Sequence, residues 1–384
     1  MGRSGMRGLL VLLFLTAPLA AQPALRTLDG AALAPAAIDR QVESLMTAEA
    51  VSGLGLALIR DGQVVYQRAY GSRDRERSLS LQPDTVMYGA SLTKAAFAWM
   101  VMQLVDEGRI VLDRPIGEYL PRPLPEHGPY ADLAGDERWR RLTMRMLLSH
   151  TSGFANFRVL DGGKLRFHRD PGTRYGYSGE GLRLAQFVLE RGLGLDVGAE
   201  MERRVFRRFG MTRTSMTWRP DFAANLAQGY GEDGKLIPHD RRDNVSAAGS
   251  MDTTLADMAR FVAAVARGEG LSANARAEMV KLQIAIDSPR QFPTLIEERT
   301  DRWQSIRLGY GLGWGVFETP FGHAFFKEGH DDGTANYALC IGRDCILMLS
   351  NSVRAERIFV TLIDALFGKV GVPAEWEGFA PAKP

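Results

Sequence analysis

The sequence predicts an α+β fold: an antiparallel sheet built from both termini, flanked by helices, with an inserted and mostly helical lobe. Near the N-terminus, two apolar strand patterns flank a turn at Asp61 and Gly62. Residues 91–267 follow a mostly helical pattern, and strand patterns return between residues 312 and 350. Strands at both ends with helices between them indicate one sheet, and a cleft is expected where the sheet meets the helical part.

The N-terminal elements follow from the apolar pattern. A helix is expected over residues 38–50. The next segment alternates on either side of Asp61 and Gly62, a pair that is typical of a tight β-hairpin. Residues 95–105 are apolar almost all round, which predicts a buried helix, and Gly108 is placed to end it.

The C-terminal elements alternate with turn residues. Strands are expected over residues 312–317, 323–327, 336–341 and 346–350. A helix over residues 357–367 is expected to close the chain. The charged, irregular residues 287–302 predict a surface loop over the cleft.

The first residues have the layout of a secretory signal peptide. Arg3 and Arg7 precede the apolar residues 8–15, and small residues follow up to Ala21. The apolar run is too short to cross a bilayer as a helix. We therefore expect cleavage near Ala21 and a periplasmic or secreted mature chain without a transmembrane segment. An uncleaved N-terminal anchor is the alternative.

After a signal peptide over residues 1–21, we expect one domain over residues 22–384. Its sheet lobe is expected over about residues 38–85 and 305–370, and its helical lobe over about residues 86–300. The 47 basic and 45 acidic side chains leave a net charge of +2, and their scattered arrangement gives no nucleic-acid-binding stripe. We expect a monomer that acts on a small molecule.

The two cysteines, Cys340 and Cys345, lie in apolar strand patterns on either side of a Gly-Arg turn. A hairpin there places them opposite each other. Because an exported protein meets an oxidising compartment, a disulfide is one interpretation. Two reduced and buried cysteines are the other.

The most informative motif is Ser91-Leu92-Thr93-Lys94, at the start of the buried helix. Residues three apart on a helix share a face, so the Lys94 amine can reach the Ser91 oxygen. A lysine held against an apolar helix is poorly solvated, which lowers its pKa and makes it a proton acceptor for a serine nucleophile. A helix-capping Ser91 beside a solvent-directed Lys94 is the alternative, and the tetrad's context decides between them.

Two further segments supply groups that a serine hydrolase needs beside its nucleophile. The glycine-bounded turn P-G-T-R-Y-G-Y-S-G carries Tyr175 and Tyr177. The segment F-K-E-G-H-D-D-G ends a strand with Lys327 and Gly329.

With these motifs the chain resembles the serine β-lactamase and penicillin-binding-protein superfamily, especially its class C β-lactamase, family VIII esterase and D-stereospecific peptidase branch. The segments that carry the resemblance are V-M-Y-G-A-S-L-T-K, L-T-M-R-M-L-L-S-H-T-S-G-F, P-G-T-R-Y-G-Y-S-G and A-A-G-S-M-D-T-T-L-A-D-M-A-R-F. They occur in the family's order, and the resemblance covers nearly all of the mature chain. It implies a β-lactamase/transpeptidase-like fold and acyl-enzyme chemistry without a cofactor.

The resemblance also implies roles for individual residues. Tyr177 falls on the tyrosine of the Tyr-x-Asn motif, which passes protons between Ser91 and the leaving group, and nearby ammonium groups such as Lys94 are expected to keep it acidic. Lys327 falls on the lysine of the Lys-Thr-Gly motif and shapes a positive field. The backbone amides of Ser91 and His330 form the oxyanion hole.

Three more positions are interpreted in the same way. Gly329 matches the glycine of the Lys-Thr-Gly motif. His150 matches a position that looks structural, under the site. Tyr175 fits a core tyrosine and ranks below Tyr177.

Two residues depart from the family pattern. Gly179 stands where the family has an asparagine that helps to bind the substrate's acylamide. Glu328 replaces a hydroxyl that helps to hold a substrate carboxylate, and Asp331 and Asp332 add negative charge. A substrate without that acid group is therefore expected. The inference weakens if Glu328 points away from the cleft or pairs with a lysine, and strand alternation leaves both orientations open.

Other chemistries fit the sequence less well. The segment around Ser178 lacks the last glycine of a G-x-S-x-G elbow. His330 with its acidic neighbours matches no zinc spacing, so neither a metal nor a Ser-His-Asp triad is expected. A ligand-binding or sensor module without turnover remains the non-catalytic alternative.

The sequence thus predicts a two-step acyl transfer at Ser91 without a cofactor. We expect an ester, amide or peptide as acyl donor, an amine-bearing one included. A true β-lactamase or a D-Ala-D-Ala carboxypeptidase is the alternative within the same chemistry.

Overall fold

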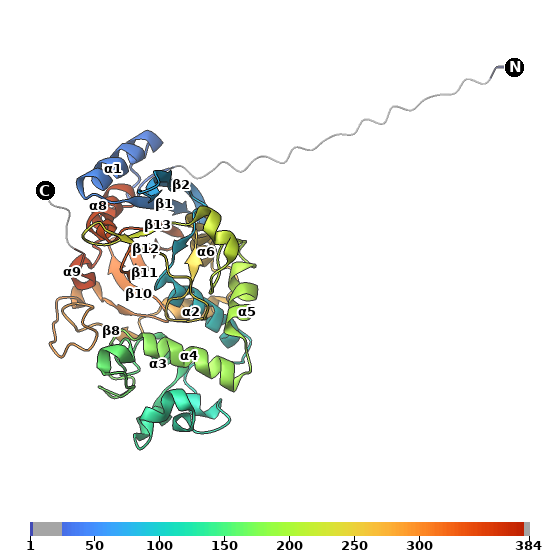
Figure 1. The fold of residues 1–384 in the computed structure, drawn as a ribbon, viewed down its shortest axis with the longest axis vertical. Helices are drawn as coiled ribbons and strands as arrows, with labels where there is room; N and C mark the ends of the chain where they lie inside the picture. The colour runs from blue at the N-terminus through green and yellow to red at the C-terminus, as the bar shows by residue number, and fades with distance from the viewer. Residues whose placement is uncertain (3–24, 380–384) are drawn as a thin grey trace.

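A computed structural model describes residues 1–2 and 25–379 of the chain (Figure 1). The signal peptide expected over residues 1–21 lies, apart from its first two residues, outside the described residues. None of the described helices combines the length and the apolar character that a bilayer crossing needs.

A nine-stranded antiparallel sheet takes its strands from both ends of the chain, as the sequence predicts. In spatial order its strands are β3 (Leu79–Ser80), β2 (Gln63–Asp74), β1 (Gly53–Arg60), β13 (Asp344–Ser350), β12 (Thr334–Ile341), β11 (Gly322–Asp331), β10 (Gly315–Thr319), β9 (Gly309–Tyr310) and β8 (Ile284–Ala285). The two ends of the chain meet where β1 pairs with β13, with Leu56 opposite Met348. Two short ladders lie outside this sheet: β4 (Met87–Tyr88) with β7 (Asp252–Thr253), and β5 (Gly229–Tyr230) with β6 (Leu236–Ile237).

Helices cover both faces of the sheet (Figure 1). One face packs against α1 (Pro35–Ala48) and α8 (Glu356–Leu366), and the other against α2 (Leu92–Asp106) and α6 (Leu255–Arg267). Between β4 and β8 the chain also forms α3 (Met144–Leu148), α4 (Gly179–Gly192), α5 (Val197–Met201) and α7 (Ala273–Val280).

Strand alternation divides the apolar residues between two cores. In β1, Leu56 and Leu58 belong to the core beneath α1 and α8, whereas Ala57 and Ile59 belong to the core that contains α2 and α6. Because both faces are covered, every residue of β1 is buried, which explains its nearly continuous apolar sequence.

Helix α2 carries the candidate nucleophile at its start. Leu92 through Leu104 are buried, as expected for an apolar surface on all sides. Ala90 has a φ of 46°, and this turn places Ser91 at the N-cap of α2. Gly108 has a φ of 69° and lies just beyond the C-cap, where a residue without Cβ is favoured.

Several predicted boundaries differ from the structure. Helix α1 begins at Pro35 rather than residue 38, because proline fits the first helical turn, where its missing N–H is not needed. Strand β10 begins at Gly315 rather than residue 312, since Gly313, with a φ of 81°, passes so close to α2 that an added Cβ would lie 2.4 Å from the Ala98 Cβ. The helix α8 does not close the chain: α9 (Ala374–Glu377) follows it.

The structure joins Cys340 and Cys345 by a disulfide. The two residues lie opposite each other in the pairing of β12 with β13, and both side chains are buried.

Candidate active site

Ser91 and Lys94 meet at the N-terminus of α2. The Lys94 Nζ lies 2.9 Å from the Ser91 Oγ and also donates to the Ala248 carbonyl oxygen. Lys94 is only 1% exposed, and its pKa lies well below the usual lysine value, mainly because burial disfavours the ammonium and also because Lys327 is near. A neutral amine in hydrogen-bond contact with a serine hydroxyl can accept its proton.

Tyr177 lies between the two buried lysines. Its hydroxyl oxygen accepts a hydrogen bond from the Lys327 Nζ at 3.5 Å, and the Lys94 Nζ lies 4.9 Å from the centre of its ring. The Ser178 side chain caps α4 by accepting from the Gly181 N–H at 3.0 Å, which fixes the turn immediately after Tyr177.

The expectation that ammonium groups keep Tyr177 acidic is wrong. Burial raises the pKa of Tyr177 well above its usual value, the negative charge of Glu328 adds to this effect, and a hydrogen bond with Ser91 only partly opposes it. Burial is the main cause, because it removes the water that would stabilise a phenolate. Tyr177 is therefore a neutral phenol that can donate and relay a proton.

His150 lies beneath the Tyr177 turn. Its Nδ1 accepts the Ser178 N–H at 3.1 Å, its carbonyl accepts the Gly176 N–H at 2.8 Å, and its ring centre lies 4.3 Å from that of Tyr177. Burial lowers the pKa of His150 well below its usual value, so the ring is neutral and holds the turn without adding charge.

Lys327 and Glu328 form a buried ion pair on β11. The Lys327 Nζ lies 2.6 Å from the Glu328 Oε1, and the Gln291 Nε2 donates to the same oxygen at 3.0 Å. Burial lowers the pKa of Lys327, and Glu328 opposes this shift. Glu328 is 7% exposed and lines the same cavity as Ser91. The Glu328 carboxylate therefore both faces the cleft and pairs with Lys327. The pairing weakens the negative field of the carboxylate in the cleft, but the side chain still occupies space there.

The cleft is a cavity of about 600 Å³. Its lining includes Ser91, Lys94, Asn156, Phe157, Tyr177, Arg183, Arg242, Phe292, Glu328, His330 and Asp331. Gly329 allows β11 to reach the Ser91 turn, because an added Cβ would lie 2.9 Å from the Gly89 carbonyl oxygen. This close approach brings the residues of the K-E-G segment to the N-terminus of α2.

Gly179 has no room for a side chain. An added Cβ would lie 2.5 Å from the Phe157 Cε1 and 3.0 Å from the Asn156 carbonyl oxygen. The Gly179 N–H donates to the Asn156 Oδ1 at 2.9 Å, so the amide nitrogen of Asn156 is left to donate elsewhere. Asn156 and Phe157 belong to no motif of the sequence, although both follow the S-H-T-S-G segment closely.

His330 contacts a carboxylate on α8. Its Nδ1 lies 2.8 Å from the Glu356 Oε1, and this contact raises the pKa of His330. Ser91 contacts Lys94 and Tyr177, whereas the His330 Nδ1 contacts Glu356, so a triad through His330 has no geometric support. Within residues 1–2 and 25–379, no three histidine, cysteine, aspartate or glutamate side chains gather as a metal site requires.

Comparisons with known proteins bear on the family and the fold of the chain. The family model described as Beta-lactamase matches residues 38–366. Penicillin-binding protein 4 of Amycolatopsis lactamdurans is 26% identical over 367 residues, which cover 88% of this chain and 91% of that protein. Esterase EstB of Burkholderia gladioli is 30% identical over 171 residues, which cover 44% of this chain and 40% of that protein. The crystal structure of the D-alanine carboxypeptidase AmpC from Burkholderia cenocepacia superposes with a TM-score of 0.68 at 21% identity, covering 86% of this chain and 98% of that one.

Proposed function

The chain belongs to the beta-lactamase family of serine hydrolases, and on that premise we propose that it is exported and forms an acyl-enzyme on Ser91, acting on an ester or amide rather than as an efficient β-lactamase. The observation that carries the proposal is the 2.9 Å contact between the Ser91 Oγ and a buried Lys94 whose pKa is well below its usual value. The non-catalytic alternative has no comparable support.

The proposed reaction begins when the neutral Lys94 amine accepts the Ser91 proton as the serine oxygen attacks the acyl carbonyl. The Ser91 amide, at the N-terminus of α2, and the His330 amide stabilise the oxyanion. Tyr177, as a neutral phenol, donates a proton to the leaving group and regains one through Lys94. Water then attacks the acyl-enzyme by the same path in reverse and releases the acid.

Glu328 supports a donor without a carboxylate beside the scissile bond. Its carboxylate lines the cleft at the position where the resembling enzymes have a hydroxyl, so an anionic group meets negative charge there. The pairing with Lys327 at 2.6 Å also occupies the cation that would bind such a group. Both effects disfavour penicillins, cephalosporins and D-Ala-D-Ala peptides relative to neutral esters and amides.

The proposal includes export and a monomeric form. A signal peptide over residues 1–21, cleaved near Ala21, leaves one hydrolase domain over residues 22–384. The N-terminal mass of protein recovered from the periplasm or medium tests cleavage. Light scattering on the purified protein tests the monomer.

A kinetic panel with a short-chain aryl ester, a D-aminoacyl amide, a chromogenic cephalosporin and D-Ala-D-Ala tests the activity. We expect the ester or the amide to give the highest kcat/KM. A fluorophosphonate should label wild-type protein but not Ser91→Ala. Peptide mass spectrometry of the labelled protein should locate the label on Ser91.

Two outcomes would contradict the proposal. Unchanged turnover by Ser91→Ala would show that Ser91 is not the nucleophile. Cephalosporin hydrolysis near the diffusion limit, or a preference for D-Ala-D-Ala, would instead favour a true β-lactamase or a carboxypeptidase with the same acyl-enzyme chemistry.

A further inference from the structure

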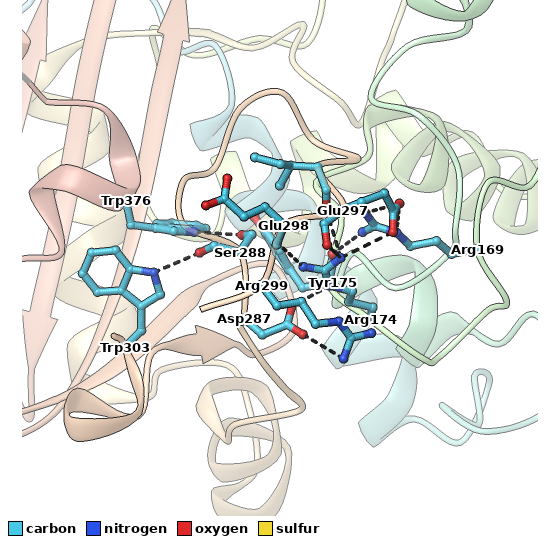
Figure 2. Close-up of polar contacts among 11 residues, drawn as sticks. Arg169, Arg174, Tyr175, Asp287, Ser288, Glu297, Glu298, Arg299, Trp303 and Trp376 are labelled. Atoms are coloured by element: carbon cyan, nitrogen blue, oxygen red, sulfur yellow. Dashed lines mark hydrogen bonds and ion pairs between the residues drawn. The ribbon is translucent and has the colours of Figure 1, made fainter. Parts of the chain in front are cut away.

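Residues 287–300, here called the strap, run over the cleft between β8 and the turn at Trp303. Arg174 anchors the strap from the turn that also carries Tyr177 (Figure 2). Its guanidinium donates to the carbonyl oxygens of Ile296 at 3.0 Å and Glu298 at 2.8 Å, and it pairs with the Asp287 carboxylate. Arg174 is itself buried. Its contacts therefore fix the start of the strap and residues 296–298 to the turn that carries Tyr177.

A second anchor lies near the C-terminus. The Trp376 Nε1 donates to the Ser288 Oγ at 3.3 Å, and the Trp303 Nε1 donates to the Ser288 carbonyl oxygen at 2.9 Å (Figure 2). The Gln291 N–H donates to the Trp376 carbonyl oxygen at 2.8 Å. Hydrogen bonds therefore hold the strap on both sides of Phe292.

Between these anchors the strap touches the candidate catalytic groups. The Gln291 side chain donates to Glu328 at 3.0 Å. The Phe292 ring meets the Tyr177 ring edge to face, with centroids 5.5 Å apart. Gly176 lets the strap pass closely, since an added Cβ would lie 3.2 Å from the Thr294 carbonyl oxygen.

Phe292 is placed to contact a substrate. One edge of its ring packs on Tyr177, yet the residue is 46% exposed and lines the cavity that contains Ser91. Phe157 brings a second ring to the same cavity. An apolar ring held over a nucleophile by anchored backbone gains contact area when an apolar group enters the cleft.

We propose that the strap determines which acyl donors the cleft accepts, with Phe292 as the residue that receives an aromatic or branched apolar group of the donor. This proposal rests on the proposed acyl-enzyme function of Ser91. It assigns Phe292 a binding role and leaves the chemical steps to the buried groups beneath it.

The test compares Phe292→Ala and Phe292→Leu with the wild-type protein on two esters that share one leaving group, an acetate and a phenylacetate. We expect Phe292→Ala to raise KM for the phenylacetate about tenfold, from the loss of apolar contact. Its kcat should change little, and the acetate should be affected less than about twofold. Phe292→Leu should recover much of the phenylacetate KM.

The matched control is Phe321→Ala. Phe321 is 37% exposed at the turn between β10 and β11, outside the cavity lining, and its replacement should leave both esters unchanged. Equal losses for both esters in Phe292→Ala would show a merely structural role, and unchanged KM values would exclude a binding role. Absence of ester turnover by wild-type protein would contradict the proposed function itself, which separates the two failures.

Discussion

The two walls of the cleft are built differently. On the α2 wall, Ser91 and Lys94 lie one helical turn apart, and their contact is set within four residues of sequence. On the β11 wall, Lys327 pairs with Glu328, and Glu328 accepts a hydrogen bond from Gln291, 37 residues away in the sequence. Local helix geometry thus fixes the proposed nucleophile, whereas long-range packing shapes the wall on which Glu328 lines the cleft. The same chemistry can therefore be kept while the substrate changes.

The largest effect should come from the α2 wall. Lys94→Met keeps the side-chain volume but removes the base, and we expect kcat on the preferred ester to fall about a thousandfold or more. Thermal stability should not fall with it, because a buried amine is replaced by an apolar group. Lys164→Met, at an exposed site, is the control. Activity within tenfold of wild type would mean that another group accepts the Ser91 proton.

The pH profile connects the two walls. Lys94 must be neutral to act, and its pKa is lowered by burial and by Lys327 and raised by Glu328. As the pH rises through the lowered pKa of Lys94, which lies below the usual lysine range, kcat/KM should therefore rise. At lower pH Lys94 gains a proton and kcat/KM should fall, which gives the profile its acidic limb.

Substitutions on the β11 wall should move this acidic limb in opposite directions. Lys327→Gln removes a cause of the low pKa and should shift the limb to higher pH, whereas Glu328→Gln should shift it to lower pH. Rate measurements across the pH range on one neutral ester can decide this. Shifts in the same direction for both variants would contradict the assignment of the limb to Lys94.

Substrate choice should respond to Glu328. Glu328→Thr removes the negative charge and frees Lys327, so the ratio of kcat/KM for a cephalosporin to that for a neutral ester should rise about tenfold to a hundredfold. Parallel kinetics on both substrates measure the ratio. A ratio that stays constant would show that the carboxylate does not select against anionic donors.

The smallest effect concerns Gly179. Gly179→Ala places a Cβ 2.5 Å from the Phe157 ring, and the resulting overpacking should lower the free energy of unfolding by about 1 kcal/mol. Denaturant unfolding of the single variants and of Gly179→Ala with Phe157→Ala tests this, because the second substitution should relieve the clash. Additive losses in the double variant would exclude the predicted contact.

The architecture and the α2 wall could be predicted because their signals are local. Apolar strand patterns at the two ends of the chain predict strands such as β1, and the spacing of Ser91 and Lys94 on a helix predicts their contact. The low pKa of Lys94 also follows from the apolar sequence around it.

The rest of the cleft could not be predicted from the sequence, because its contacts join distant segments. No periodicity in the sequence indicates that Phe157 fills the space beside Gly179 or that Gln291 holds Glu328. The wrong expectation for Tyr177 has the same origin: its pKa depends on how completely the packed fold excludes water and on the charge of Glu328, which lies far away in the sequence. Motif matching identifies such residues but not their protonation.

The short helix α9 sets a practical limit on how this protein can be shortened. The family match ends at residue 366, yet Trp376 supports the strap, and the Glu377 Oε1 accepts a hydrogen bond from the Tyr337 hydroxyl at 2.7 Å, one strand behind Lys327. Expression of a version trimmed to the family boundary would remove both supports while keeping every motif residue. A shortened version for kinetic work therefore needs to keep α9.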